Sequence, residues 1–113
     1  LLRRAHAAQR LIAERHAYVA SHDVLTGLAN RGTFRQALSA LSGERVTVLA
    51  IDLDGFKPIN DTHGHLAGDR LLVSIARRLE RIMATLPGSL AARFGGDEFF
   101  VLLRGLDPAA AEE

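Results

Sequence analysis

The sequence predicts an α+β domain in which helices cover a small antiparallel sheet. Residues 46–53 form a short apolar run rich in β-branched side chains, which is typical of a strand. Residues 90–94 and 99–103 are two further apolar segments separated by a glycine-containing turn, which predicts a β-hairpin. Because the segments between them have helical periodicity, we expect helices on one or both faces of the sheet.

The N-terminal residues 1–20 are rich in Ala, Leu and Arg and contain neither Gly nor Pro, which favours a helix. Arg15 interrupts a heptad pattern of apolar side chains formed by Leu1, Ala5, Ala8, Ile12 and Val19. The pattern resembles the end of a coiled-coil stalk, and the alternative is a plain solvated helix. We therefore expect a stalk at 1–20 and a partial domain at 21–113.

Capping residues and glycines predict where the first helix ends and where the second helix begins and ends. Gly27 lies in a segment that ends the first helix, and Asn30 is expected to cap a second helix. The apolar face of that helix comprises Phe34, Leu38 and Leu41. Gly43 ends it, and we interpret residues 46–53 as a central strand.

A short helical segment is expected at residues 54–63, where Gly64 ends it. A long amphipathic helix follows, beginning near Leu71 and ending before Pro87. Its expected apolar face comprises Leu71, Leu72, Ile75, Leu79, Ile82 and Met83. After the hairpin, Asp107 and Pro108 are typical of another helix start.

Composition excludes several classes of protein. The 113 residues suffice for one domain with a modest core. A net charge of +1 and only 5% aromatic residues argue against a nucleic-acid partner. The chain has no Cys, which excludes disulfides and thiolate zinc sites and is compatible with a reducing, cytoplasmic location. No apolar run reaches the ~18 residues that span a bilayer. Since the chain lacks an initial Met, we expect it to be cut from a longer protein, with any membrane tether upstream.

Acidic residues stand at two predicted strand ends. Residues 93–99 read Arg-Phe-Gly-Gly-Asp-Glu-Phe, and the two glycines allow a tight turn without a Cβ in the way of a ligand. Asp52 ends the strand upstream, and Asp97 lies in the glycine turn. This arrangement suggests a metal and a phosphate-bearing ligand. The alternative is that both acids only cap turns or accept backbone hydrogen bonds.

Four blocks of residues, in the same order, match one family. They are the signature at Gly95–Phe99 and the segments 23–31, 52–57 and 60–69. Over residues 22–104 the chain thus resembles the GGDEF domains, the bacterial diguanylate cyclases. The resemblance implies a fold like the palm of nucleotide cyclases and polymerases, a ferredoxin-like antiparallel sheet with covering helices. It also implies that each domain binds one GTP and that a homodimer forms cyclic di-GMP and two pyrophosphates.

The resemblance implies a metal site made of hard oxygen ligands. Its members would be the carboxylates of Asp52 and Asp97 and the carbonyl of Leu53, holding Mg²⁺ or Mn²⁺. Asp97, where many relatives carry Glu, would also accept the proton of the attacking hydroxyl. Glu98 is a candidate second acid near the metal.

The phosphates would lie against the glycine turn. Backbone amides of Gly95 and Gly96 would approach them closely, while Lys57 would add a point charge that stabilises the transition state. The alternative for Lys57 is an ordinary solvated lysine. Phe56 is expected to be core or pocket wall.

Asn60 and Asp69 match the positions that read guanine in the family. A carboxylate can accept from guanine N1–H and the N2 amine, and an amide can serve O6 or N3. The alternative is that Asn60 caps a turn and Asp69 caps the long helix.

Other polar residues are expected to be structural. We interpret His65 as a turn residue, in preference to a zinc pair with His63. Arg31 is expected to pair with Asp23 or Asp61, and Arg93 to play a similar role under the hairpin.

The sequence departs from the family in two ways. Leu86 and Ser89 occupy the positions of an inhibitory Arg-x-x-Asp site, so product inhibition there is not expected. The family's domain also continues beyond residue 113, including basic residues that hold the terminal phosphates, so this chain alone should bind GTP poorly.

Two functional hypotheses follow. The intact set of acids, glycines and lysine favours a diguanylate cyclase, acting in the full-length protein under an upstream sensory domain. The alternative is a catalytically silent GGDEF module that senses GTP or serves as a regulatory dimerisation domain. The homodimer would form through the active-site face and the N-terminal helix.

Overall fold

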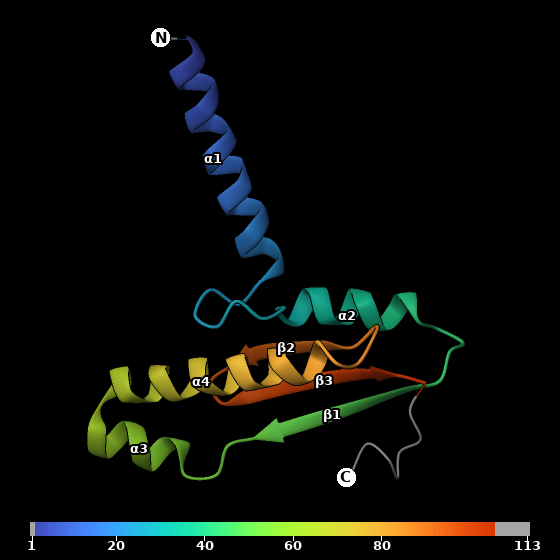
Figure 1. The fold of residues 1–113 in the computed structure, drawn as a ribbon. Coiled ribbons are helices and arrows are strands. Elements are labelled where there is room, and N and C mark those ends of the chain that lie inside the picture. Colours follow the sequence, from blue (N-terminus) through green and yellow to red (C-terminus); the bar gives the residue numbers. More distant parts are fainter. Residues whose placement is uncertain (1, 106–113) are drawn as a thin grey trace.

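The computed structural model describes residues 2–105, with side chains from residue 8 onward, and it confirms the α+β class (Figure 1). The elements in chain order are α1 (Leu2–Ser21), α2 (Arg31–Ala40), β1 (Val46–Asp52), α3 (Phe56–His63), α4 (His65–Met83), β2 (Leu90–Gly95) and β3 (Glu98–Arg104). The predicted hairpin is β2 and β3. The helix expected from Asp107 lies outside the described residues.

The sheet is antiparallel, with the strand order β1-β3-β2. The prediction that residues 46–53 form a central strand was wrong for the described sheet, because β3 is central and β1 lies at an edge. The burial pattern agrees with this order. Along β1 half-buried Leu49 and Ile51 alternate with exposed positions, whereas β3 is buried from Val101 to Leu103.

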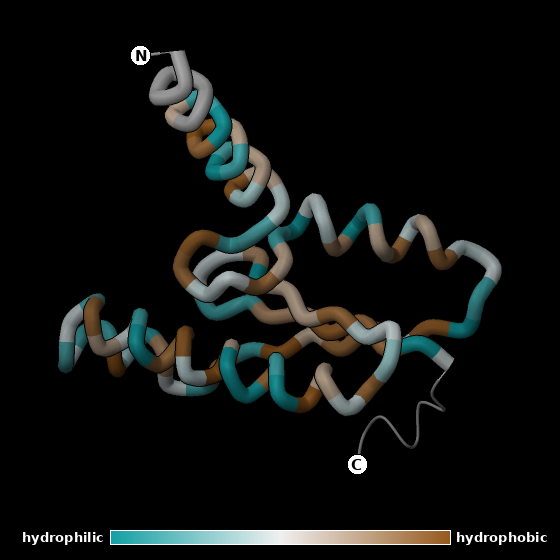
Figure 2. The backbone as a smooth tube through the Cα atoms, turned by 45° about the horizontal axis from the view of Figure 1, so that its top comes forward, coloured by the Kyte–Doolittle hydropathy of each residue, from teal (hydrophilic) through white to brown (hydrophobic). Residues whose placement is uncertain are grey.

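Helices cover both faces of the sheet, as the apolar runs predicted (Figure 1). On one face α4 packs Leu72 and Ala76 against Phe99 and Val101 of β3. On the other face the α2 side chain Phe34 lies with Phe94 and Phe100, at ring-centroid distances of 5.5 and 6.0 Å. Figure 2 shows the corresponding pattern, with apolar stretches along the strands and alternating hydropathy along the helices.

The start of α4 differs from the expectation. The helix begins at His65, because Gly64, with a φ of +88°, separates it from α3 as a single residue. Asp69 therefore lies inside α4 and does not cap it. Ile82, expected on the apolar face, is 52% exposed, since it lies about 80° around the helix from fully buried Leu72.

α1 confirms the predicted N-terminal helix and projects away from the sheet (Figure 1). Every side chain from residue 8 to residue 20 is exposed. Asn30 joins this helix to the domain. Its Nδ2 donates to the Ala20 carbonyl at 2.9 Å, and its Oδ1 accepts from the Thr33 amide at 3.0 Å, which confirms the predicted cap of α2. No helix of the described chain is sufficiently long and apolar to cross a bilayer.

Candidate active site

One end of the sheet gathers most of the residues that the sequence singled out (Figure 1). In the register of β1 and β3, Asp52 lies directly opposite Glu98, and Val46 and Arg104 meet at the other end. The β2–β3 turn adjoins Glu98, and α3 begins at Phe56, shortly after β1 ends. The antiparallel pairing therefore places the end of β1, the hairpin turn and the start of α3 together.

The acidic residues at this end of the sheet are the candidates for a cation site. Directly opposed residues of paired strands project to the same face, and like charges there repel each other. Asp52 and Glu98 are both exposed and form no ion pair within the described part of the chain. Asp97, half-buried, precedes Glu98 in the turn. Carboxylate oxygens are the ligands that Mg²⁺ prefers.

The proposed metal set uses only two carboxylates and one backbone carbonyl. Across the described residues, no three side chains of the types His, Cys, Asp and Glu gather into a metal site. The two histidines considered for zinc, His63 and His65, are exposed. His65 is the first residue of α4 and not part of the preceding turn.

The glycine turn is open on its outer side. Gly95 and Gly96 have φ values of +136° and +50°, which residues that carry a Cβ rarely adopt. A Cβ built on either residue would meet no atom within 4 Å. The glycines are thus required by the backbone conformation, and they leave space where a ligand could approach the turn.

Arg93 ties this turn to the loop that follows α1. Its Nε donates to the Gly96 carbonyl at 3.0 Å, and its Nη1 donates to both carboxylate oxygens of Asp23 at 2.9 and 3.1 Å. The side chains of Arg93 and Asp23 are only 12% and 16% exposed. This confirms a structural role for Arg93 under the hairpin.

Asp23 is held by hydrogen bonds on its other side as well. It accepts from the Thr26 hydroxyl at 2.7 Å and from the Thr26 amide at 2.9 Å. Burial works to raise the pKa of Asp23, but these hydrogen bonds and the Arg93 guanidinium outweigh it and hold the pKa below its usual value.

The expectation that Arg31 pairs with Asp23 or Asp61 was wrong, since neither ion pair is present among the described residues. Arg31 instead lies over the Phe94 ring, with its Cζ 5.1 Å from the ring centroid. The reason is the path of the loop: the Arg93 amide donates to the Ala29 carbonyl at 3.0 Å. This bond lays the loop along β2 and brings Asp23 next to Arg93.

The side chains expected to bind nucleotide lie on α3 and α4. Phe56 is half-buried and packs against the core beneath α4, and Lys57 is exposed. Asn60 and Asp69 are both half-buried. The Asn60 carbonyl accepts from the Gly64 amide at 2.8 Å, whereas its side-chain Oδ1 is enclosed and has no hydrogen-bond partner within the described residues. The Asn60 side chain therefore does not serve as a turn cap.

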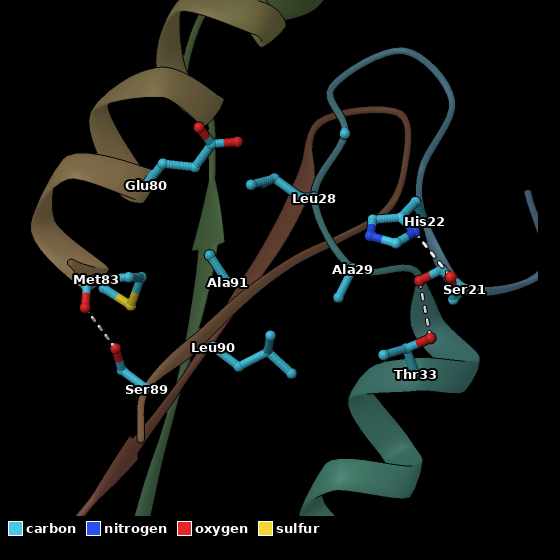
Figure 3. A pocket seen from close by; sticks show the side chains of 11 residues that line it. Ser21, His22, Leu28, Ala29, Thr33, Glu80, Met83, Ser89, Leu90 and Ala91 are labelled. Carbon is cyan, nitrogen blue, oxygen red and sulfur yellow. Dashed lines mark hydrogen bonds between the residues drawn. The ribbon is translucent and has the colours of Figure 1, made fainter. Parts of the chain in front are cut away.

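A pocket of about 310 Å³ lies on the outer side of β2 (Figure 3). His22, Ser21 and Thr33 line one side of it, and Glu80 and Met83 of α4 line the other. None of the predicted site residues lines this pocket. It is therefore separate from the acidic end of the sheet.

The two positions of the inhibitory site are used by the fold. Leu86 packs against the core beneath α4. The Ser89 hydroxyl bonds to two backbone carbonyls, those of Leu86 at 2.6 Å and Met83 at 3.1 Å. The side chains at both positions thus make contacts within the domain.

The fold is that of an α+β domain with a glycine turn and acidic residues at one end of an antiparallel sheet, and the comparisons identify its family. A family profile described as "Diguanylate cyclase, GGDEF domain" matches residues 20–113. The diguanylate cyclase DgcN of Escherichia coli is 49% identical over 92 residues, which cover 74% of this chain and 21% of that protein. The chain belongs to the GGDEF diguanylate cyclase domain family.

Two solved structures extend the likeness to the backbone. A sensory box/GGDEF family protein from Caulobacter crescentus is 49% identical, with a TM-score of 0.69, covering 81% of this chain and 62% of that one. The coiled coil and GGDEF domain of DgcB from the same organism, in complex with c-di-GMP, is 30% identical, with a TM-score of 0.76, covering 95% and 58%. The chain spans between 13% and 37% of the length of the first curated relatives that it matches.

Sequence reasoning missed one residue next to the candidate site. Gly68, buried in α4, lies against the Asn60 side chain. The available signal was a glycine inside a helical pattern, where it lowers helix stability unless a packing contact needs it.

Proposed function

We propose that this chain is part of a diguanylate cyclase that condenses two GTP molecules into cyclic di-GMP and two pyrophosphates in the full-length protein. The observation that carries the proposal is the pairing of Asp52 with Glu98 beside the open glycine turn. This pairing concentrates negative charge where a cation and a triphosphate would meet. The family relationship supports the same reaction.

The residues that would hold the metal are Asp52 and Asp97, through their carboxylates, and Leu53, through its carbonyl. Mg²⁺ or Mn²⁺ bound there would lower the pKa of the attacking 3′-hydroxyl and offset charge on the α-phosphate. Asp97 would accept the hydroxyl proton, and Glu98 would act as a second acid beside it.

The phosphates would lie against the turn and the start of α3. Because Gly95 and Gly96 leave the outer side of the turn open, their backbone amides can donate to phosphate oxygens. Lys57 is exposed on the first turn of α3, so its ammonium group is free to approach the same oxygens. Phe56 anchors this end of α3 to the core.

The base would be read between α3 and α4. Asp69 would accept from guanine N1–H and the N2 amine, and the Asn60 amide would meet O6 or N3. Guanine O6 and N3 are acceptors, so the Asn60 Nδ2 would be the group that donates to them, while the enclosed Oδ1 has no partner within the described residues. Adenine presents the wrong donors and acceptors, which would leave these groups unpaired.

The reaction requires two domains, since each 3′-hydroxyl attacks the α-phosphate of the other GTP. We propose that α1 brings them together, because its apolar residues Leu11, Ile12 and Val19 are exposed and belong to neither core cluster of the described residues. The solved relative DgcB is described as a coiled coil with a GGDEF domain. An upstream sensory domain would then act through this helix.

The test is to incubate the full-length protein with GTP and Mg²⁺ and to identify the product by chromatography and mass spectrometry. We expect cyclic di-GMP and pyrophosphate, and no product when Mg²⁺ is chelated. If GTP binds without any product, the protein is instead a silent module that senses GTP or regulates dimerisation.

Cyclic di-GMP is not expected to inhibit through residues 86–89, because both side chains are engaged within the domain. The measurement is the initial rate at increasing product concentration, for the wild type and for Ser89→Ala. Non-competitive inhibition that Ser89→Ala abolishes would contradict this expectation.

A further inference from the structure

Gly68 and Asn60 form a contact that no Cβ would permit. A Cβ built on Gly68 would overlap the Asn60 Oδ1 and would lie 2.8 Å from its Cγ and 3.3 Å from its Nδ2. The three atoms nearest to such a Cβ all belong to the Asn60 amide. The Asn60 side chain on α3 thus fills the space that a methyl group at residue 68 of α4 would occupy.

The backbone itself does not require glycine here. Gly68 is not among the glycines with positive φ, and it lies inside α4, where alanine would be the better helix former. Gly68 is nevertheless buried. The packing of the Asn60 amide is therefore the feature that demands glycine at this position.

We propose that Gly68 is a positioning residue for base selection: it sets the depth at which the Asn60 amide lies between α3 and α4. The inference rests on the proposed function, in which guanine is read by Asn60 and by Asp69, the residue that follows Gly68. With a methyl group at residue 68, the amide would be pushed away from α4, the helix that carries Asp69. The expected consequence is a loss of guanine preference, with binding of the triphosphate retained.

The test measures the affinity of the full-length protein for GTP and ATP in the presence of Mg²⁺ by equilibrium dialysis, using the 3′-deoxy forms of both nucleotides, which lack the attacking hydroxyl and so are not turned over. For Gly68→Ala we expect GTP affinity to fall about tenfold or more, as for the loss of one hydrogen bond to the base. ATP affinity should stay unchanged, because it depends on the phosphates. Gly68→Ala with an unchanged ratio of GTP to ATP affinity would overturn the inference.

A double-mutant cycle with Asn60→Ala tests whether Gly68 acts through Asn60. If it does, Asn60→Ala/Gly68→Ala should bind GTP no more weakly than Asn60→Ala alone. Losses that add in full would show that Gly68 acts independently of Asn60 and would overturn the inference.

Thermal unfolding provides a readout without nucleotide. Gly68→Ala should lower the Tm, and the double variant should recover it, since removal of the Asn60 amide makes room for the methyl group. Gly32→Ala is the matched control, because it adds the same methyl group to α2 with only an ordinary contact at 3.7 Å. A double variant as unstable as Gly68→Ala would place the collision elsewhere and would overturn the inference.

The controls separate this inference from the proposed function. A wild-type protein that binds GTP and ATP equally would refute base reading by this site, and the role of Gly68 with it. A wild-type protein that prefers GTP, together with a Gly68→Ala variant that keeps the preference, would refute only the role of Gly68.

Discussion

The hairpin side and the helical side of the candidate site are held in place by different interactions. On the hairpin side, the guanidinium of Arg93 links the Gly96 carbonyl to the Asp23 carboxylate through charged hydrogen bonds. On the helical side, the Asn60 amide is positioned by close packing on Gly68 and has an unsatisfied oxygen. A satisfied network of hydrogen bonds holds the turn rigidly, whereas packing on Gly68 sets where the Asn60 amide lies. Under the proposed function, the hairpin side would perform the chemistry and the helical side would select the base.

The largest expected effect is on the hairpin side. Asp97→Ala in the full-length protein should lower turnover by about 10³-fold or more, because it removes the residue that we propose as both a metal ligand and the proton acceptor. The ratio of GTP to ATP affinity should not change. Turnover is measured by cyclic di-GMP formation, with circular dichroism as the control for folding. Retained turnover would refute the metal assignment.

The helical side should show the opposite pattern. Asp69→Ala should weaken GTP binding by about 10- to 100-fold, since hydrogen bonds to a charged group contribute roughly 1.5–3 kcal/mol each. ATP binding should change little, and competition between the two nucleotides measures the difference. Equal losses for both nucleotides would remove the guanine assignment and, with it, the division of roles between the two sides.

A comparison of two arginines at opposite ends of the sheet, Arg93 and Arg104, tests whether the hairpin turn must be held in place. Arg93→Ala should destabilise the domain by about 1–3 kcal/mol, because it leaves the enclosed Asp23 carboxylate short of a partner, and turnover should fall about tenfold. Arg104→Ala is the matched control. Its bridge to Glu44 is 45% and 48% exposed, so it should cost less than about 1 kcal/mol. Denaturant unfolding and product formation measure the two effects.

If the two arginine variants lose equal stability and activity, the buried Arg93–Asp23 pair contributes no more than the exposed Arg104–Glu44 pair. A loss of stability without a loss of turnover would mean that Arg93 supports the fold but does not position the turn.

The smallest expected effect is a pH dependence of the hairpin side. The pKa of Asp23 is lower in the folded protein than in the unfolded chain, so its contribution to stability is full above the unfolded value of about 4. That contribution is lost as the pH falls through the folded pKa. Unfolding measured between pH 2 and 7 should therefore show a smaller acid-dependent loss for Asp23→Asn than for the wild type. Identical pH profiles would contradict this assignment.

Local features of the sequence were sufficient to predict the type and order of the helices and strands, and the acidic residues at one end of the candidate site. The apolar run before Asp52 and the two glycines before Asp97 predicted a strand end and a turn, because strand periodicity and positive φ depend only on nearby residues. Once the hairpin was expected, antiparallel pairing could bring the acids to the same end. The positions of these acids follow from the sequence, and their chemical roles stay a prediction.

The tertiary structure alone decided which side chains meet across the chain. Sequence reasoning gave Asp23 and Asp61 as possible partners of Arg31, but the loop along β2 brings Asp23 to Arg93, 70 residues away in sequence. It considered a helix cap as the alternative role of Asp69, but α4 begins earlier, directly after Gly64, so that Asp69 lies inside the helix and Gly68 packs on Asn60. Periodicity predicts which residues lie on one face of an element. The partner of that face depends on strand order and loop path, which are set by the packing of the whole domain.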